Sequence, residues 1–177
     1  TSRWLPVGLF YAGVTGLALA AIRSDDRLGL YAMLFVFAVV WATDILAYFV
    51  GRALGGPKLA PSISPGKTWS GAIGGAVSAV AAGVVLVHFL LPGAEIIAAF
   101  AALVLSICSQ SGDLFESFIK RRFGVKDSSR LIPGHGGVMD RVDGLIFACF
   151  SAFLLAGLFS LIKGTAMTSL GAALFGL

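Results

Sequence analysis

Charged residues are scarce in this sequence, and their scarcity excludes most soluble folds. Only 12% of the 177 residues are Asp, Glu, Lys or Arg, whereas 58% are hydrophobic. A soluble domain carries about 25% charged residues, and a soluble helical protein would need far more of them to cover its surface. Together with a mean hydropathy of +0.94, this composition predicts an integral membrane protein.

Several reactive motifs are also absent. The two cysteines, Cys108 and Cys149, lie in apolar runs without the spacing of a metal pair, so neither a disulfide framework nor a zinc site is predicted. There is no GxxxxGK[ST] spacing of a P-loop and no Ser–His–Asp arrangement. We expect Trp4–Ile22 to be a span rather than a cleavable signal peptide, because it lacks a small-residue cleavage site in a suitable context. Because the chain begins at Thr1, we expect residues 1–177 to be a single membrane catalytic domain, the C-terminal portion of a protein with further spans before it.

Long apolar runs dominate what is present. A helix of about 20 apolar residues spans a bilayer, and five runs come close to this length. They are Trp4–Ile22, Leu28–Val50, Ser70–Leu91, Glu95–Ser111, which continues as a polar helix through Phe123, and Leu145–Ile162. The shorter run Ala166–Leu177 is expected to form an interfacial or packed terminal helix. The predicted fold class is therefore all-α, a polytopic membrane bundle of about five transmembrane helices plus a short terminal helix.

The positive charges predict the orientation of this bundle. If the five spans alternate, only Arg23, Arg27 and Lys163 of the 13 Lys and Arg residues lie on one side. By the positive-inside rule the opposite side is cytoplasmic. We therefore expect a protein of the cytoplasmic (inner) membrane with its active site facing the cytoplasm. The Gly- and Ala-rich third span suits close helix packing, including a possible homodimer.

The first polar loop, Thr43–Gly71, mixes Gly, Pro and Ser with cations. Its backbone N–H groups and the Lys67 ammonium can bind phosphate, or the loop is a flexible basic segment that contacts anionic lipid headgroups. Asp44 interrupts the apolar run WATDILAYF. An ionisable group there faces a polar cavity or a partner, or it reaches out to the interface from near the helix end.

The second polar stretch begins with SQSGDLFESFIKRRFG and continues to residue 144. On a helix, Asp113, Glu116, Ser117 and Lys120 recur at spacings of three and four, so they share one face. Such a face can hold a divalent metal and a phosphate side by side. It can equally be a solvated face with ordinary i,i+4 ion pairs.

Glycine and proline end this helix in KDSSRLIPGHGG, which predicts a tight loop whose backbone can approach a ligand. His135 in this loop is either structural or catalytic. Asp140 and Asp143 follow at a spacing of three and, without an obvious Lys partner, suggest a hard cation such as Mg²⁺. Arg130 and Arg141 can bind phosphate oxygens in pairs.

Together these features predict a membrane-embedded site that is open to the cytoplasm and rich in carboxylates and cations. Carboxylates suit Mg²⁺, whereas Lys and Arg neutralise polyphosphate. The set fits phosphoryl or nucleotidyl transfer, in which positioning and charge neutralisation supply most of the catalysis. No nucleic-acid partner is expected.

The stretch Ser117–Asp143 resembles the signature of the phosphatidate cytidylyltransferases, the CDP-diacylglycerol synthases. The matching positions are Ser117, Lys120, Arg121, Lys126, Asp127, Ser129, Ile132, Pro133, His135, Gly136, Gly137, Asp140, Arg141 and Asp143. The segments DILAYFVGR, KLAPSISPGKTWSG and SQSGDLFES also look like this family. Two positions depart from it, because Ser70 stands where the family often has Glu and Gly144 where it commonly has Ser.

The resemblance implies that CTP and phosphatidic acid react to give CDP-diacylglycerol and pyrophosphate, with Mg²⁺ alone or together with a second cation. The lipid phosphate would attack the α-phosphorus of CTP while the acyl chains stay among the membrane lipids. Implied catalytic residues are Asp113, Lys120, Asp140 and Asp143, and implied metal ligands are Asp113, Asp140, Asp143 and Asp44. Implied substrate-binding residues are Ser64, Lys67, Ser117, Arg121, Lys126, Asp127, His135, Gly136, Gly137 and Arg141.

Other functions stay open at this point. A related CTP-dependent enzyme could act on another membrane lipid, as a polyprenol kinase or a CDP-archaeol synthase does, because the lipid-contacting residues are anonymous apolar ones. An ion-coupled transporter could use Asp44 and Asp113 on its path, although polar residues gathered at one membrane face fit that function less well. An inactive scaffold is disfavoured by the retained acidic and basic residues.

Overall fold

The computed structural model describes residues 4–129, 137, 139–164 and 170–177. Its elements in chain order are α1 (Trp4–Arg23), α2 (Gly29–Leu54), β1 (Lys58–Ala60), β2 (Ser64–Thr68), α3 (Trp69–Leu90), α4 (Glu95–Arg122), α5 (Met139–Lys163) and α6 (Leu170–Ala173). Helices α2, α3, α4 and the Val142–Lys163 part of α5 are long and apolar enough to cross a membrane. In α1 the apolar stretch is shorter, Gly8–Arg23. The predicted membrane bundle of helices is confirmed.

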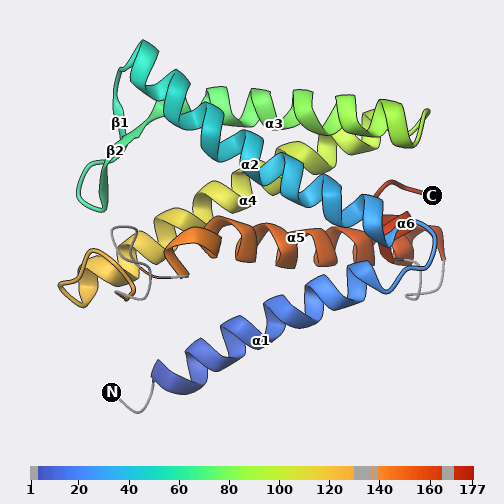
Figure 1. Ribbon diagram of the computed structural model, residues 1–177, viewed down its shortest axis with the longest axis horizontal. Helices are drawn as coiled ribbons and strands as arrows, with labels where there is room; N and C mark the ends of the chain where they lie inside the picture. Colours follow the sequence, from blue (N-terminus) through green and yellow to red (C-terminus); the bar gives the residue numbers. More distant parts are fainter. Residues whose placement is uncertain (1–3, 130–136, 138, 165–169) are drawn as a thin grey trace.

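Helices α1 to α5 alternate in direction, so the bundle has two distinct ends (Figure 1). The two strands, the C-terminal ends of α2 and α4 and the N-terminal ends of α3 and α5 gather on the left of Figure 1, which we call the polar end. The short helix α6 and the turn between α1 and α2 lie on the right, at what we call the far end.

The hairpin of β1 and β2 is the main departure from the predicted fold. The two strands pair antiparallel, with Lys58 opposite Thr68 and Ala60 opposite Ser64. They form in a segment with several prolines, and a residue before proline favours extended backbone over helix. Thr68 then ends the hairpin and begins α3, because its Oγ1 accepts a hydrogen bond from the Gly71 N–H at 3.1 Å.

Helix α3 approaches α2 closely through a row of small residues. The buried positions of α3 are Gly71, Gly75, Ala79, Gly83 and Val87. These residues are four apart and therefore share a face. A Cβ atom at Gly75 would lie 2.8 Å from the backbone oxygen of an α2 residue, Thr43, so glycine permits the close approach of the two backbones. The small-residue face therefore packs inside the chain, and the homodimer stays a prediction.

The hydrophobic core reaches from the middle of the bundle to the C-terminal segment. Phe35, Leu105 and Phe175 are fully buried. The rings of Phe35 and Phe175 meet edge to face, with their centroids 5.4 Å apart. Such edge-to-face and close apolar contacts stabilise the packing of helices inside a membrane bundle. Within the predicted terminal helix, the structure places the short α6 and buries Leu170 and Phe175, so the described part of that segment is packed rather than interfacial.

Asp25 joins the α1–α2 turn to the C-terminal segment at the far end. Its Oδ1 accepts hydrogen bonds from the backbone N–H groups of Arg27 at 2.9 Å and Leu28 at 3.0 Å, and its Oδ2 accepts one from Ala172 of α6 at 2.9 Å. Burial alone would raise the pKa of Asp25, but these bonds and the Arg27 charge hold the pKa below its ordinary value. The carboxylate thus closes the α1–α2 turn and anchors the C-terminal segment.

Candidate functional site

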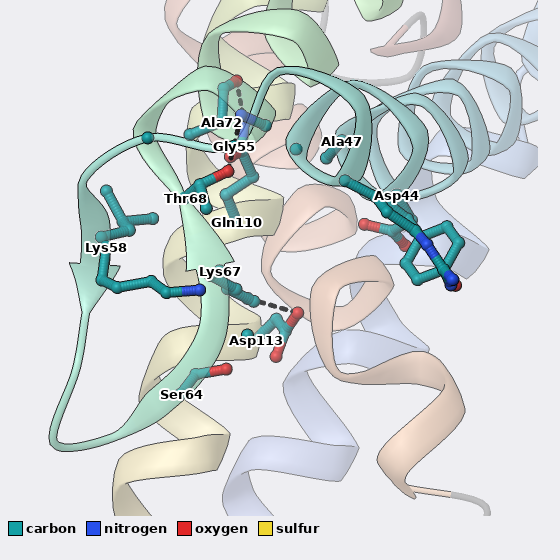
Figure 2. A pocket seen from close by; sticks show the side chains of 17 residues that line it. Asp44, Ala47, Gly55, Lys58, Ser64, Lys67, Thr68, Ala72, Gln110 and Asp113 are labelled. Carbon is teal, nitrogen blue, oxygen red and sulfur yellow. Dashed lines mark hydrogen bonds and ion pairs between the residues drawn. The ribbon is translucent and has the colours of Figure 1, made fainter.

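A cavity of about 650 Å³ lies at the polar end, between α2, the hairpin, the start of α3 and the middle of α4 (Figure 2). This volume is typical of a small-molecule site. Its polar lining comprises Asp44, Tyr48, Arg52, Lys58, Ser64, Lys67, Thr68, Gln110 and Asp113. The predicted interruption of the second span at Asp44 therefore corresponds to a carboxylate that faces a polar cavity.

An ion pair joins the hairpin to α4 at the wall of this cavity. The Lys67 ammonium from β2 contacts Oδ2 of Asp113 on α4 (Figure 2). The other oxygen of Asp113 accepts a hydrogen bond from Ser117 Oγ, one helical turn away, at 3.4 Å. Both charged side chains keep about a third of their surface exposed, 27% for Lys67 and 33% for Asp113. The pair is therefore accessible to a ligand in the cavity.

A second charged cluster lies farther along α4, where this helix meets the start of α5. Lys120 Nζ lies 2.8 Å from Asp140 Oδ1 and 3.6 Å from Glu116 Oε1. The Lys120 and Asp140 side chains are only 15% and 10% exposed. Glu116 and Lys120 are four residues apart, as the predicted shared face requires. The low exposure means that water screens these charges less than it screens surface ion pairs.

Asp140 also holds the segment that follows α4. Its oxygens accept hydrogen bonds from Ser128, through the backbone N–H and Oγ at 2.9 Å each, and from the Gly137 N–H at 2.7 Å. Partial burial alone would raise the pKa of Asp140, but the bonds from Lys120, Gly137 and Ser128 hold the pKa well below its ordinary range. A Cβ atom at Gly137 would lie 2.9 Å from the Ser129 backbone nitrogen, so glycine suits this close approach.

Three carboxylates from three helices concentrate negative charge next to these clusters. Asp44 of α2, Asp113 of α4 and Asp143 of α5 lie close enough to repel one another, and Lys67 offsets part of the charge at Asp44. Glu116 lies near Asp143, both of its carboxylate oxygens are buried, and Lys120 Nζ is 3.6 Å from its Oε1. Within that part, no three His, Cys, Asp or Glu side chains are grouped closely enough to hold a metal ion.

The remaining predicted site residues lie around the segment after α4. The Arg121 guanidinium donates from Nε to the carbonyl of Ile63 in the hairpin turn and from Nη1 to the carbonyl of Val125, both at 3.3 Å. Lys126 and Asp127 are exposed. The predicted residues Arg130, His135 and Gly136, together with the Arg141 side chain, lie outside the described residues. The functional roles assigned to all these residues stay predictions.

Five polar residues of the cavity lining were not predicted as site residues: Tyr48, Arg52, Lys58, Thr68 and Gln110. Tyr48 and Arg52 follow Asp44 at intervals of four residues, so the helical period of α2 would have pointed to them. Lys58 lies in the hairpin, whose strands were not predicted. Gln110 belongs to α4 one turn before Asp113, in a stretch whose amphipathic pattern starts only at that aspartate, and nothing in the sequence marks it.

Gln110 connects the cavity to a chain of hydrogen bonds inside the bundle. Its Nε2 donates to the backbone oxygen of Ala72 at 3.2 Å and to Ser106 Oγ at 3.3 Å. Ser106 Oγ in turn accepts a hydrogen bond from Thr43 Oγ1 at 2.9 Å. Thr43 and Ser106 are fully buried. These bonds satisfy polar groups that would otherwise destabilise an apolar interior.

The two departures from the family signature have structural counterparts. The Ser70 hydroxyl donates to the Gly55 carbonyl, and it lies 3.0 Å from Thr68 Oγ1, so it ties the start of α3 to the end of α2. Gly144 on α5 lies against Ser109 of α4, where a Cβ atom would be 3.3 Å from the backbone oxygen. Each substitution thus sits at a contact between helices rather than in the cavity lining.

The sequence matches a known family along most of its length. Residues 2–159 match the model of the cytidylyltransferase family. The chain is 56% identical over 158 residues to the phosphatidate cytidylyltransferase of Brucella abortus biovar 1 (strain 9-941), a match that covers 89% of this chain and 58% of the relative. The corresponding enzyme of Haemophilus influenzae is 47% identical over 156 residues, covering 82% of this chain and 54% of the relative.

The same name belongs to a more distant relative, the phosphatidate cytidylyltransferase of Bacillus subtilis (strain 168), which is 40% identical over 158 residues, or 89% of this chain and 59% of the relative. The chain spans between half and three-fifths of the length of these relatives. These matches confirm the resemblance to the phosphatidate cytidylyltransferases, and they extend well beyond the signature segment Ser117–Asp143. The chain therefore belongs to the cytidylyltransferase family.

Proposed function

We propose that this protein transfers the cytidylyl group of CTP to phosphatidic acid, with release of CDP-diacylglycerol and pyrophosphate. The observation that carries the proposal is the cavity at the polar end of a membrane-spanning bundle, where Lys67 and Asp113 meet beside the Lys120–Asp140 cluster. Such a site can bring soluble and membrane-bound anions together. The names of the relatives support the choice of substrates.

The lipid phosphate is the nucleophile in this proposal. A phosphate monoester is already anionic at neutral pH, so the reaction needs no general base. One of its oxygens forms a bond to the α-phosphorus of CTP, while the bond from that phosphorus to the pyrophosphate oxygen breaks. Repulsion between the two polyanions is the main obstacle. Lys67 and Lys120 would reduce this repulsion by placing positive charge beside the phosphate oxygens.

We further propose that Mg²⁺ binds among Asp44, Asp113 and Asp143. Because these three side chains are not grouped as a complete ligand set, one or two of them would hold the ion together with substrate phosphate oxygens and water. These carboxylates are the oxygen ligands that Mg²⁺ prefers, and their mutual repulsion would be relieved by a cation. Bound Mg²⁺ would polarise and neutralise phosphate oxygens. Asp140 stays a predicted ligand. Because its oxygens accept bonds from Lys120, Ser128 and Gly137, a cation there would replace one of these donors. A second cation also stays a prediction.

The proposed orientation places the polar end at the cytoplasmic face of the inner membrane. Lys58, Lys67, Lys120, Arg121 and Lys126 lie at this end, and an excess of Lys and Arg favours the cytoplasmic side. Soluble CTP would enter the cavity from that side. The acyl chains of phosphatidic acid would remain in the bilayer.

The test is turnover of radiolabelled CTP by the purified protein in mixed micelles that contain phosphatidic acid. We expect labelled CDP-diacylglycerol only when a divalent metal is present, because the carboxylates and phosphates would otherwise repel one another. A polyprenol or an archaeal-type lipid in place of phosphatidic acid tests for the related CTP-dependent activities. Turnover that is absent, or that persists in excess chelator, would contradict the proposal.

A further inference from the structure

One part of the cavity carries positive charge that no acidic side chain offsets. Arg52 and Lys58 both line the cavity, and in the described part of the chain neither forms an ion pair. Lys67, by contrast, is paired with Asp113, and Lys120 is paired as well. Unneutralised cations beside a cavity attract an anion.

Helical spacing separates this cationic part from the acidic part of the same cavity. Asp44, Tyr48 and Arg52 are four residues apart on α2, share a face and all line the cavity. At 1.5 Å per residue, Arg52 lies about 12 Å along the helix axis from Asp44. The cavity is therefore long enough to hold two anionic groups, one beside the carboxylates and one beside Arg52.

A hydrogen bond to Tyr48 holds the Arg52 guanidinium and leaves donors of both side chains available to an anion. Nη1 of Arg52 donates a hydrogen bond to the Tyr48 hydroxyl oxygen at 2.8 Å. The hydroxyl proton thus remains available to an anion, and the guanidinium retains further N–H donors. A guanidinium can bind two phosphate oxygens at once. Lys58 extends from β1 toward the interior of the site (Figure 2) and adds a second positive charge.

We propose that Arg52, Tyr48 and Lys58 bind the phosphate monoester of the lipid substrate, an inference that rests on the proposed function. Arg52 lies in the last turn of the membrane-spanning helix α2, at the depth where lipid headgroups meet water. On the same helix, Phe49 and Leu54 are 60% and 74% exposed, which provides apolar surface for acyl chains. The nucleotide phosphates then occupy the acidic part, where a metal can accompany them.

The inference is tested with Arg52→Gln, which removes the charge, and Arg52→Lys, which keeps the charge but loses the paired donors. Arg23→Gln is the matched control, because Arg23 ends α1 at the far end. We expect Arg52→Gln to raise the KM for phosphatidic acid about tenfold or more, as loss of a charged hydrogen bond does. Arg52→Lys should show a smaller rise, and the KM for CTP should stay within about twofold.

A binding measurement without CTP or metal separates this inference from the catalytic proposal. Tryptophan fluorescence is followed as micelles of phosphatidic acid, micelles of phosphatidylcholine or inorganic phosphate are added to each variant. Wild type and Arg23→Gln should bind phosphatidic acid more tightly than phosphatidylcholine, and Arg52→Gln should lose this preference. If these binding results hold but no CDP-diacylglycerol forms, the proposed function fails and the phosphate subsite stands.

Three results would overturn the lipid subsite. The first is an unchanged affinity of Arg52→Gln for phosphatidic acid. The second is a rise in the KM for CTP alone, which would assign Arg52 to the nucleotide. The third is binding of inorganic phosphate as tight as that of phosphatidic acid, which would mean that the site recognises free phosphate rather than a lipid headgroup.

Discussion

Asp140 forms an ion pair with Lys120 and also accepts hydrogen bonds from the segment after α4. All these contacts favour the charged carboxylate, and they hold its pKa well below the ordinary value of about 3.9. Stability gained from a lowered pKa is present above the unfolded pKa and is lost as pH falls toward the folded one. The Lys120–Asp140 contact should therefore persist across the physiological pH range.

Asp140→Asn should abolish most turnover. The carboxamide has no charge to balance the Lys120 ammonium, and it offers a single acceptor oxygen to Lys120, Ser128 and Gly137. We expect the rate with CTP and phosphatidic acid to fall at least about 100-fold, the scale of losing one preorganised electrostatic group. Asp26→Asn, an exposed change at the far end, is the control. A near wild-type rate of Asp140→Asn at saturating Mg²⁺ would remove Asp140 from both the metal and the positioning roles.

At this scale the sequence indicated which residues carry chemistry but not which of them touch. Spacing placed Asp113 and Ser117 on one face, and the structure joins them. The contact between Lys67 and Asp113 links residues far apart in sequence, and no periodicity can encode such a pair. Arg52 was overlooked because a single Arg near the end of an apolar helix is also the usual sign of a membrane boundary.

Among the elements, the long helices were predictable because their apolar runs are continuous. The expected span Ser70–Leu91 corresponds to α3 at Trp69–Leu90, and the expected polar continuation of the fourth span to residue 123 corresponds to the end of α4 at Arg122. The hairpin was not predicted, because strands of three and five residues with proline and glycine lack an alternating apolar pattern. The hairpin nevertheless supplies Ser64 and Lys67 to the cavity.

The contact between α2 and α3 yields a test at the scale of elements. Gly75→Val should destabilise the bundle by about 1–3 kcal/mol, because added methyl groups would force the backbones apart. Gly13→Val is the control, since a Cβ atom at Gly13 meets nothing within 4 Å. Thermal loss of helical circular dichroism in detergent measures both variants. A midpoint for Gly75→Val equal to that of Gly13→Val would show that the two helices do not pack through this face.

In the whole molecule, the candidate functional site and the contacts that anchor the C-terminal segment lie at opposite ends of the bundle. The cavity and charged clusters occupy the polar end, whereas Asp25 joins the α1–α2 turn to α6 at the far end (Figure 1). The grouping of Lys and Arg on alternate loops predicted that charged residues gather at one end of the bundle, the polar end. The role of Asp25 was not predicted, because a carboxylate in a short polar turn is ordinary in sequence and its third hydrogen bond comes from a distant residue.

Asp25→Asn should lower the thermal midpoint at pH 7, since a neutral amide is a weaker acceptor for three backbone N–H groups. The pKa of Asp25 is lowered in the fold, so its contribution is complete above the unfolded pKa of about 3.9 and declines below it. The difference in midpoint between wild type and Asp25→Asn should therefore shrink as the pH falls below about 4. Melting curves from pH 3 to 8 measure this. Asp26→Asn should track wild type throughout, and a difference for Asp25→Asn that is independent of pH would contradict the assignment.

The hydrogen bond between Asp25 and Ala172 spans 147 residues of sequence, and this separation has a consequence in time. At a synthesis rate of about 5–20 residues per second, Ala172 is made roughly 7–30 s after Asp25. During that interval the donor at Ala172 does not yet exist, whereas the local donors Arg27 and Leu28 are already present. The contacts of Ala172 with Asp25 and of Phe175 with Phe35 therefore cannot form until synthesis has reached these residues, and until then the surface that receives Phe175 stays uncovered by it.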